Sequence, residues 1–246
     1  MSLSVVMITY NEEHHIKDAL DSVKQADEII VLDSFSEDNT VAIAREYGCT
    51  VYQEEWKGFS GQKNSVIEKA TSDWVFLLDA DERISTELWD EIQKTISSDS
   101  GFDGYEVPRK SYFLGRWMSH GGWWPDYVLR LFRRGRGWIP SRQVHERIVV
   151  DGGVGRLKGH LIHLAYESIG EFVEKSKGYA KLSAQEMRLD GKGFSPLKLI
   201  FSPVVTFFRM YFMRRGFLDG IHGFILAALY CYYTFLKYAF LWEDEG

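Results

Sequence analysis

Two carboxylates that flank a small residue, Asp79-Ala80-Asp81, give the clearest chemical signal in this sequence. They directly follow the apolar run 74–78, so the chain turns at Asp79 and both carboxylates can face the same open space. Paired carboxylates attract Mg²⁺ or Mn²⁺, which prefer oxygen ligands and keep positions open for water or phosphate. Because a diphosphate needs this neutralisation before it can leave, we predict a divalent-metal site here.

Two further polar clusters follow predicted strands in the same way. Thr9-Tyr10-Asn11-Glu12 ends the run 3–9, and Asp33-Ser34 ends the run 28–32. Ligands of a doubly wound sheet bind outside the carboxyl ends of its strands, so we expect all three clusters to line one crevice. A single acidic residue after a strand is more often a turn former, but three clusters at one edge favour function.

The alternation of strand-like and helix-like segments predicts the sheet that positions these clusters. Continuous apolar runs such as 3–9 are typical of parallel strands that are buried on both faces. This rhythm predicts an open, mostly parallel α/β sheet with helices on both faces. The expected elements are strand 3–9, helix 13–24, strand 28–32, helix 41–47, strand 50–52, helix 61–70 and strand 74–78.

The rest of the chain has a different pattern. From about Gly101 to His163, short β-like pieces with glycines and aromatics predict a mixed β extension, with strands near 105–107, 127–132 and 144–150. A helix is expected from Ser168 to Leu189, because its apolar residues recur at helical spacing.

Composition and missing motifs narrow the class of protein. A chain of 246 residues with a net charge of -6 suits one α/β domain with an appendage or two small domains, and argues against nucleic acid as a partner. No Gly-x-Gly-x-x-Gly follows the first strand and no Gly-Lys-Ser/Thr loop is present, which disfavours dinucleotide oxidoreductases and P-loop hydrolases. Cys49 and Cys231 are far apart, as expected for reduced thiols of a cytoplasmic protein.

The segment from Ser195 to Leu241 is rich in Phe, Tyr, Leu and Ile, and is interrupted by Arg209 and Arg214-Arg215. Its last part, from Gly223 on, carries a single charge and lies at the lower edge of the ~20 residues that a span needs. Three alternatives stay open: helices that lie in a membrane interface, buried packing in an oligomer or against a domain, and a true span. We favour the interfacial helices because of the tyrosines and the neighbouring arginines.

An ordered series of motifs resembles family 2 glycosyltransferases. The matching runs are Val5 to Glu12, Ile29 to Ser34 with Ser36 to Thr40, Gly61-Gln62-Lys63-Asn64, and Leu77-Leu78-Asp79-Ala80-Asp81-Glu82. The later run Arg130-Leu131-Phe132-Arg133, with Val144-His145-Glu146 and His163, is similar to a bacterial subgroup that includes lipopolysaccharide inner-core β-glucosyltransferases. With these runs the resemblance spans most of the chain and implies a GT-A fold.

The resemblance implies a UDP-sugar donor and a Mn²⁺ or Mg²⁺ ion. Asp33 would accept a hydrogen bond from uracil N3–H, Asp81 would bind the metal, and Asp79 would reach the ribose or the metal. Arg130 alternates with Leu129 and Leu131, so we expect it to point inwards towards a phosphate. The candidate nucleotide-sugar-binding residues are Thr9, Tyr10, Asn11, Glu12, Asp33, Lys63, Asn64, Asp79 and Arg130.

Inversion at the anomeric carbon needs a general base that takes the proton of the acceptor hydroxyl. Many relatives place an Asp after a Glu at this step, whereas the matching region here reads His145-Glu146. Glu146 is the candidate base, His145 would orient it or touch the diphosphate, and Asp126 is the rival. An ion pair of Glu146 with Arg142 or Arg147 is an equally good interpretation.

Two further roles are assigned to single side chains. His163 is a candidate metal ligand beside Asp81 and Asp79, although a His that ends an apolar run is more often structural. Trp123 and Trp124 are the candidate acceptor platform, because a flat indole can stack on a sugar face. Core packing is the competing interpretation for any single Trp.

We therefore expect a metal-dependent, inverting transferase that moves a hexose, glucose first, from a UDP-sugar to a lipopolysaccharide core or other cell-envelope acceptor. Residues 1–165 would form the GT-A catalytic domain, with nucleotide-sugar binding in 1–100 and the acceptor region in 101–165. Residues 166–246 would form a helical region that contacts the cytoplasmic face of the inner membrane or a second copy. The alternatives are a protein or peptide acceptor, and an inactive nucleotide-sugar-binding scaffold.

Overall fold

The computed structural model describes residues 1–98, 101–140 and 147–243. The chain divides into two compact units: Met1–Arg109 with Tyr127–His163, and Lys110–Asp126 with Leu164–Gly246. The second unit joins the C-terminal part, from Leu164 on, with residues 110–126, and the expected division into 1–165 and 166–246 stays a prediction. Residues 110–126 group with the C-terminal helices because Phe113 and Met118 are buried in one apolar cluster with residues of those helices.

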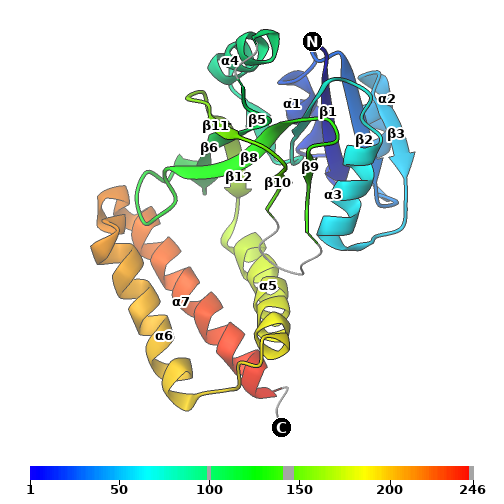
Figure 1. The fold of residues 1–246 in the computed structure, drawn as a ribbon. Coiled ribbons are helices and arrows are strands. Elements are labelled where there is room, and N and C mark those ends of the chain that lie inside the picture. Colours follow the sequence, from blue (N-terminus) through cyan, green and yellow to red (C-terminus); the bar gives the residue numbers. More distant parts are fainter. Residues whose placement is uncertain (99–100, 141–146, 244–246) are drawn as a thin grey trace. The chain divides into compact units, whose positions relative to one another are not determined.

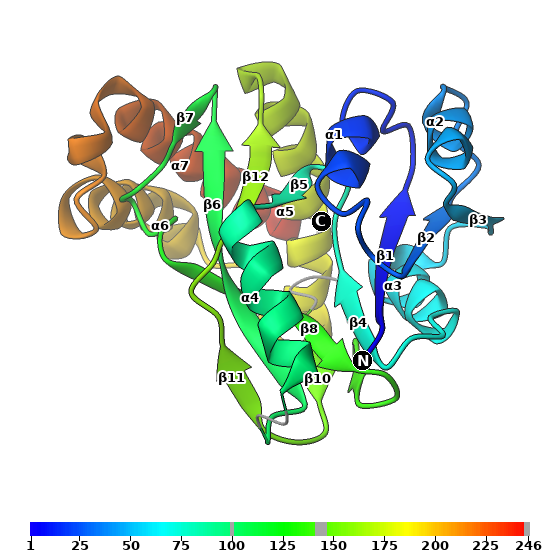
Figure 2. The ribbon, with the colours of Figure 1, turned by 90° about the horizontal axis from the view of Figure 1, so that it is seen from above.

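The main sheet lies largely in the first unit, where helices cover both of its faces (Figures 1 and 2). In the strand order β3-β2-β1-β4-β8-β6-β12-β5, the first four strands are parallel to one another and β8 joins β4 antiparallel. This confirms the expected α/β class and the mostly parallel N-terminal sheet. The strands of that parallel part are β1 (Leu3–Thr9), β2 (Glu28–Asp33), β3 (Thr50–Gln53) and β4 (Trp74–Leu77).

The remaining strands extend this sheet or pair beside it. Strand β11 pairs with β6, β7 also pairs with β6, and β9 pairs with β10 in a separate two-stranded sheet. The bounds are β5 (Glu82–Ile84), β6 (Gly104–Phe113), β7 (Arg116–Trp117), β8 (Asp126–Arg133), β9 (Gly137–Trp138), β10 (Val149–Val150), β11 (Val154–Arg156) and β12 (Leu161–Tyr166).

Alternate residues of each parallel strand serve the two faces of the sheet. Leu3, Val5 and Met7 belong to the same apolar cluster as buried residues of α1, α2 and α4, whereas Val6 packs with α3. Because both faces are covered, every position of β1 must be apolar or satisfied, which explains its continuous apolar run. The helices are α1 (Ile16–Asp21), α2 (Thr40–Glu46), α3 (Gly58–Glu68) and α4 (Thr86–Ser97).

The elements of this unit differ from the expected ones mainly at their ends. The helix expected over 13–24 is confined to Ile16–Asp21, because Glu12 and His15 form a turn that precedes it. Strand β5 and helix α4 were not expected, although Ser85 caps α4 by accepting a hydrogen bond from Leu88 N at 3.2 Å. Of the strand expected over 144–150, Val149–Val150 is observed, and residues 144–146 lie outside the described residues.

Three long helices and two short helical turns dominate the second unit. Ser168 caps the first helix by accepting from Glu171 N at 3.0 Å, as expected for a helix that starts there. Helix α7 packs along α5 and along α6, which Figure 1 shows as the neighbouring yellow, orange and red helices. The elements are α5 (Ile169–Leu189), α6 (Pro196–Phe208), the π-turn η1 (Arg209–Met213), the 3₁₀ turn η2 (Gly216–Asp219) and α7 (Gly220–Glu243).

The helical stretch Gly216–Glu243 is long and apolar enough to cross a membrane, judged by length and composition among the described residues. Its 28 residues include an 18-residue window of mean hydropathy 1.5, of which 22% is buried in the protein. A core helix of a water-soluble protein is mostly buried, so the low buried share of this apolar helix is not explained by core packing alone.

Glu54 ties the loop after β3 to helix α3. Its carboxylate accepts hydrogen bonds from Lys57 Nζ at 2.6 Å, Ser65 Oγ at 2.6 Å and Lys69 Nζ at 2.7 Å. The hydrogen bonds from Lys57 and Lys69 lower the pKa of Glu54 from 4.5 to about 2. Because the pKa is lower in the folded state, this stabilisation is complete above pH 4.5 and is lost as the pH falls towards 2.

We expect Glu54→Gln to flatten the acid end of the stability profile. The free energy of unfolding of the wild type should fall as the pH is lowered from 4.5 to 2. In the variant this fall should be smaller. Urea denaturation at a series of pH values measures it. The exposed neighbour provides the control, since Glu55→Gln should keep the wild-type slope. Identical slopes in wild type and Glu54→Gln would contradict the assignment.

Candidate active site

The carboxyl ends of β1 and β2 are joined by hydrogen bonds between the loops that follow them. Asn11 N donates to Ser36 Oγ at 2.8 Å, and Asn11 Oδ1 accepts from Glu37 N at 2.9 Å. Glu12 N donates to Thr40 Oγ1 at 2.8 Å. Asn11 has a φ of 55°, a left-handed conformation that Asn tolerates better than most residues. The predicted nucleobase loop is therefore a fixed turn and not a loose connection.

Asp33 lies at the end of β2 and is fully buried. Its Oδ1 accepts from Thr9 Oγ1 at 3.0 Å and from Ser36 Oγ at 2.5 Å. Its Oδ2 accepts from Ser36 N at 2.8 Å and from Gln53 Nε2 at 3.3 Å. A carboxylate has about four lone-pair positions, and these four donors fill them. The N–H of a nucleobase would therefore have to displace one donor, and the long hydrogen bond from Gln53 is the weakest.

Asp79 follows β4 and is held between two cations. Lys63 Nζ lies 3.0 Å from its Oδ1, and Arg130 Nη2 lies 2.5 Å from its Oδ2. The same Arg130 nitrogen is 2.8 Å from Oε1 of Glu82, which has a fully buried side chain. Arg109 also reaches that oxygen, at 3.3 Å. The motif 79–82 is therefore part of a compact ion network at the edge of the sheet.

This network decides the charge state of Asp79. Burial alone raises the pKa of the Asp79 carboxyl, but the positive charges of Arg130 and Lys63 outweigh it and hold that pKa well below its usual range. Burial lowers the pKa of Arg130, and the carboxylates of Asp79 and Glu82 raise it further than burial lowers it. Asp79 is thus ionised at neutral pH, and its charge is shared with protein cations.

Asp81 is oriented towards a different partner. His163 Nε2, on β12, lies 3.5 Å from Oδ2 of Asp81, and the two side chains are 17% and 22% exposed. An aspartate oxygen beside an imidazole nitrogen is a donor pair that Mn²⁺ accepts readily, whereas Mg²⁺ favours oxygen alone. In residues 1–98, 101–140 and 147–243, no three His, Cys, Asp or Glu side chains gather as a complete metal site. The pair fits a metal whose other positions are filled by phosphate and water.

Two predicted nucleotide-binding residues have contrasting surroundings. The side chain of Asn64 clamps the chain near β9, since Nδ2 donates to Ile139 O at 2.7 Å and Oδ1 accepts from Ile139 N at 2.9 Å. Tyr10 is 57% exposed beyond the end of β1, in a position open to a ligand. Their contacts with a nucleotide stay predictions.

The sequence motifs gave no role to several residues that build this site. Glu82 is the buried acceptor for Arg130 and Arg109, and Gln62 Nε2 donates to Ser34 Oγ at 3.1 Å. Glu82 and Gln62 both lie inside the quoted motifs. Its place directly after the Asp-x-Asp motif was the signal available for Glu82. Arg109 lies outside the motifs, and no signal in the sequence pointed to it.

The remaining site predictions fall outside this cluster. His145 and Glu146 lie outside the described residues. Asp126 begins β8 and groups with the second unit. In that unit Trp123 packs edge-on against Phe113, with ring centroids 6.4 Å apart, as a partly buried member of its apolar cluster.

Trp124 has a setting that suits ligand stacking better. It packs edge-on against Trp117 at 5.6 Å, and Lys110 Nζ lies within 5.9 Å of both ring centroids. Nε1 of Trp117 is buried and has no hydrogen-bond partner among the described residues. The general-base and acceptor assignments stay predictions.

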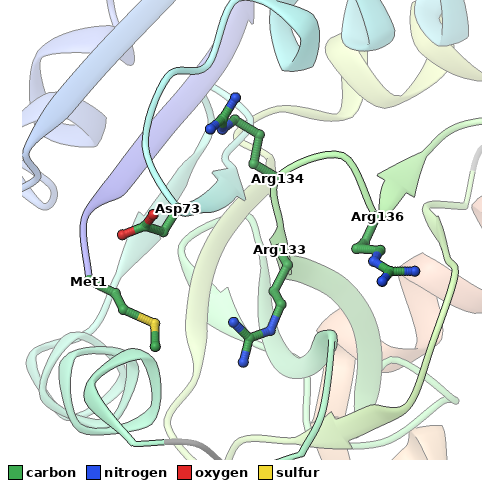
Figure 3. Close-up of a pocket in the computed structure, with 5 residues that line it drawn as sticks. All are labelled: Met1, Asp73, Arg133, Arg134 and Arg136. Carbon is green, nitrogen blue, oxygen red and sulfur yellow. The ribbon is translucent and has the colours of Figure 1, made fainter.

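An open hollow of about 350 Å³ lies at the other end of the sheet, by the start of β4 (Figure 3). Its arginine side chains point in different directions, so they do not converge on a single anion. Arg133 pairs with Asp103 and Arg136 with Asp151, which uses part of their charge. We do not assign the nucleotide to this hollow, because ligands of such sheets bind at the carboxyl ends of the strands. Its lining residues are Met1, Asp73, Arg133, Arg134 and Arg136.

Comparison with known proteins agrees with the motifs and the fold. The family model described as glycosyl transferase family 2 matches residues 4–151. The lipopolysaccharide core biosynthesis glycosyltransferase LpsC of Rhizobium meliloti is 33% identical, over 100% of this chain and 94% of the relative. A glycosyltransferase of Rickettsia typhi is 31% identical, over 98% of this chain and 87% of the relative.

A solved structure matches along the whole chain as well. Residues 1–349 of TarS from S. aureus superpose with a TM-score of 0.50 at 17% identity, covering 100% of this chain and 91% of that chain. At this identity the likeness shows the fold alone. It confirms the GT-A arrangement, with C-terminal helices, that the sequence predicted.

Proposed function

Because this chain belongs to glycosyl transferase family 2, we propose that it moves a hexose, glucose first, from a UDP-sugar to a lipopolysaccharide core saccharide or another cell-envelope glycan. The observation that carries the proposal is the arrangement of acidic side chains at one edge of the sheet. Strands β2 and β4 flank β1 on either side in parallel register, so Asp33, which ends β2, and Asp79, which follows β4, belong to strands that end at the same edge. A nucleotide and its diphosphate bind at such an edge.

The described residues supply the donor half of the reaction. The loops after β1 and β2 hold the base, Lys63 and Arg130 provide positive charge for the diphosphate, and Asp81 with His163 would hold a divalent ion. When bound, that ion would neutralise charge on the departing diphosphate. Of the two ions expected, the imidazole favours Mn²⁺.

The acceptor half follows from the chemistry of inversion. The acceptor oxygen attacks the anomeric carbon, the bond from that carbon to the diphosphate oxygen breaks, UDP leaves, and a general base takes the hydroxyl proton. Glu146 is our candidate for the base and Asp126 its rival, with His145 orienting Glu146. Trp123 and Trp124 are the candidate acceptor platform, and Lys110 beside Trp124 suits an acceptor that carries a negative charge.

The name of the R. meliloti relative supports the lipopolysaccharide acceptor, since its similarity covers the whole chain. We place the reaction at the cytoplasmic face of the inner membrane, where a lipid-linked acceptor is in reach of a peripheral enzyme. A protein acceptor and an inactive scaffold are the competing proposals. Retention of both Asp79 and Asp81 speaks against the scaffold, because a binder has no need of a metal for leaving-group departure.

A thermal-shift panel tests the donor. We expect one UDP-sugar with Mn²⁺ to raise the melting temperature by roughly 5 °C or more when it is present at about 100 times its Kd. The same sugar on GDP is the control and should give a smaller shift, because the base contact at Asp33 suits uracil. Absence of any shift, with every UDP-sugar and with or without Mn²⁺, would overturn the donor assignment.

Turnover separates the enzyme from the scaffold. Release of UDP from the best donor should rise when a bacterial membrane extract supplies the acceptor. Binding of UDP without turnover of any donor in that extract would favour the scaffold. A product that is sensitive to protease and insoluble in lipid solvents would favour the protein acceptor.

A further inference from the structure

The outward face of helix α6 is apolar along its whole length. The exposed side chains recur at the i, i+3, i+4 spacing that places residues on one face of a helix. A helix at the surface of a water-soluble protein carries polar residues on its outward face, so we expect a binding partner to cover these apolar side chains. The side chains, which are 55% to 68% exposed, are Leu197, Ile200, Phe201, Val204, Val205 and Phe208.

The apolar surface continues through the turns that follow α6. Phe212 and Met213 in η1 are 50% and 70% exposed, and Phe217 and Leu218 in η2 are 45% and 51% exposed. We call these four residues and the six of α6 the C-terminal apolar face. Isolated exposed apolar residues need no explanation, but a continuous set on consecutive elements marks a binding surface.

The charges that flank this face have one sign. Lys198, Arg209, Arg214 and Arg215 are exposed. Between Pro196 and Trp242 the sequence has a single acidic residue, Asp219, and that residue is only 2% exposed. The surface around the C-terminal apolar face is therefore cationic.

Asp219 is kept away from that surface by its hydrogen bonds. Its Oδ1 accepts from Ser119 Oγ at 3.0 Å, and its Oδ2 accepts from His120 N at 2.8 Å. The charge of Asp219 thus anchors the turn before α7 and does not offset the exposed arginines.

We infer that the C-terminal apolar face lies in the interface of a lipid leaflet that contains anionic phospholipids, with α6 parallel to the membrane plane. An apolar helix face flanked by cations is what such an interface binds, through buried hydrocarbon and attraction to the headgroups. The inference deepens the proposed function and rests on it only for the lipid-linked acceptor. It selects the interfacial alternative among the three that the sequence left open.

A transmembrane path for α7 conflicts with the packing of α5. Tyr233 Oη and Ser183 Oγ are 3.0 Å apart, and the rings of Phe172 and Tyr230 lie 5.5 Å apart, so α5 runs against α7. Helix α5 carries exposed charges such as Lys177 and Lys181. A spanning α7 would bring these charges into the hydrocarbon or lose its partner. Helix α6, with 13 residues, is about 20 Å long and too short to cross ~30 Å.

A second copy of the chain is a poor cover for the same face. In a two-fold dimer each patch meets itself, so Arg209, Arg214 and Arg215 of one copy would approach those of the other. Like charges placed together in this way oppose association. Anionic headgroups complement these arginines, whereas the same face of another copy does not.

Flotation of the purified full-length protein with lipid vesicles tests the inference. We expect it to float with phosphatidylcholine vesicles that contain phosphatidylglycerol and to stay behind with pure phosphatidylcholine. Phe201→Ser with Phe208→Ser should lower binding at least tenfold, because two exposed phenyl rings no longer enter the interface. Val154→Ser with Ile169→Ser is the matched control, since it removes two exposed apolar side chains elsewhere.

The charge contribution has its own pair of variants. Arg209→Gln with Arg215→Gln should weaken binding to the anionic vesicles roughly 30-fold, since each basic residue near such a surface contributes about fivefold. Lys17→Gln with Lys24→Gln removes the same charge from exposed positions of the first unit and should leave binding unchanged. Equal losses of vesicle binding in the two double variants would show that net charge alone attracts the protein to the membrane, and would overturn the assigned face.

Three other results would overturn the inference. They are undiminished flotation of the two-phenylalanine variant, a dimer in light scattering that the same variant abolishes, and resistance of the membrane-bound protein to alkaline carbonate, which marks a span. The UDP-sugar shift, measured on the same preparation without vesicles, keeps the two proposals apart. A protein that binds the donor but no vesicle retains the proposed function, and one that binds vesicles but no donor retains the lipid contact.

Discussion

Replacing Asp81 with asparagine is expected to lower kcat/KM for donor turnover about 10³-fold, because a divalent ion contributes several kcal/mol to departure of the diphosphate. The amide has nearly the size of the carboxylate but lacks its charge, so the fold should be unaffected. Asp81 and His163 lie 3.5 Å apart as the donor pair, and His163→Asn should therefore reduce turnover in the same direction. Initial rates of UDP release at several Mn²⁺ concentrations measure both effects.

Asp90 provides the matched control for this change. It is an exposed aspartate of α4 in the same unit, and Asp90→Asn should keep wild-type turnover and Mn²⁺ dependence. The UDP thermal shift should lose its Mn²⁺ dependence in Asp81→Asn and keep it in Asp90→Asn. If Asp81→Asn responds to Mn²⁺ as the wild type does, the metal site lies elsewhere.

Replacing Arg130 with methionine is expected to lower the free energy of unfolding by about 3 kcal/mol. Arg130 is 6% exposed and is the shared partner of Asp79 and Glu82. Methionine fills a similar volume without the charge, so Glu82 would lose its closest cation in a buried position. The loss exceeds that of a surface pair because the buried Glu82 carboxylate would keep only Arg109, at 3.3 Å, and cannot recover its hydration. Urea denaturation followed by circular dichroism at pH 7 measures it.

Arg136→Met is the control, since Arg136 pairs with Asp151 at 2.9 Å between side chains that are 52% and 70% exposed. It should change stability by less than about 1 kcal/mol, as exposed ion pairs do. Adding Glu82→Gln to Arg130→Met should recover part of the loss, because the buried charge that has lost its closest cation is then gone. A change in Arg130→Met no larger than in Arg136→Met would show that the network does not stabilise the fold.

Much of the first unit was predictable because its patterns are local. The run 74–78 is apolar at every position and the run 3–9 at all but Ser4 and Thr9, and the strands that they form pack their two faces on different helices. Such runs predict parallel strands, and the polar residues that follow them mark the carboxyl ends. The first helix was predicted too long at both ends, and β5 was missed because a three-residue strand leaves almost no periodicity to read. Helix α4 was also missed, although Leu88, Ile92 and Ile96 recur at helical spacing.

The partners of the site residues were harder to predict from the sequence. Arg130 was expected to point inwards, but its partners Asp79 and Glu82 depend on β8 joining the sheet beside β4, where Arg133 lies opposite Trp74. The Asn64 clamp on Ile139 spans 75 residues and leaves no trace in composition or spacing. Sequence separation is large in both cases, and the contacts form only when distant elements of the fold come together.

The sequence by itself determined that polar clusters would follow parallel strands, because short-range periodicity and motif order record this, and it predicted which of their side chains carry the chemistry. Only the tertiary structure decided how the charges are shared: Asp79 between Lys63 and Arg130, and Asp81 beside His163. It also decided that residues 110–126 group with the C-terminal helices. The physical reason is that ion pairs and buried contacts form between strands and helices distant in the chain, and these meet only when the sheet is assembled.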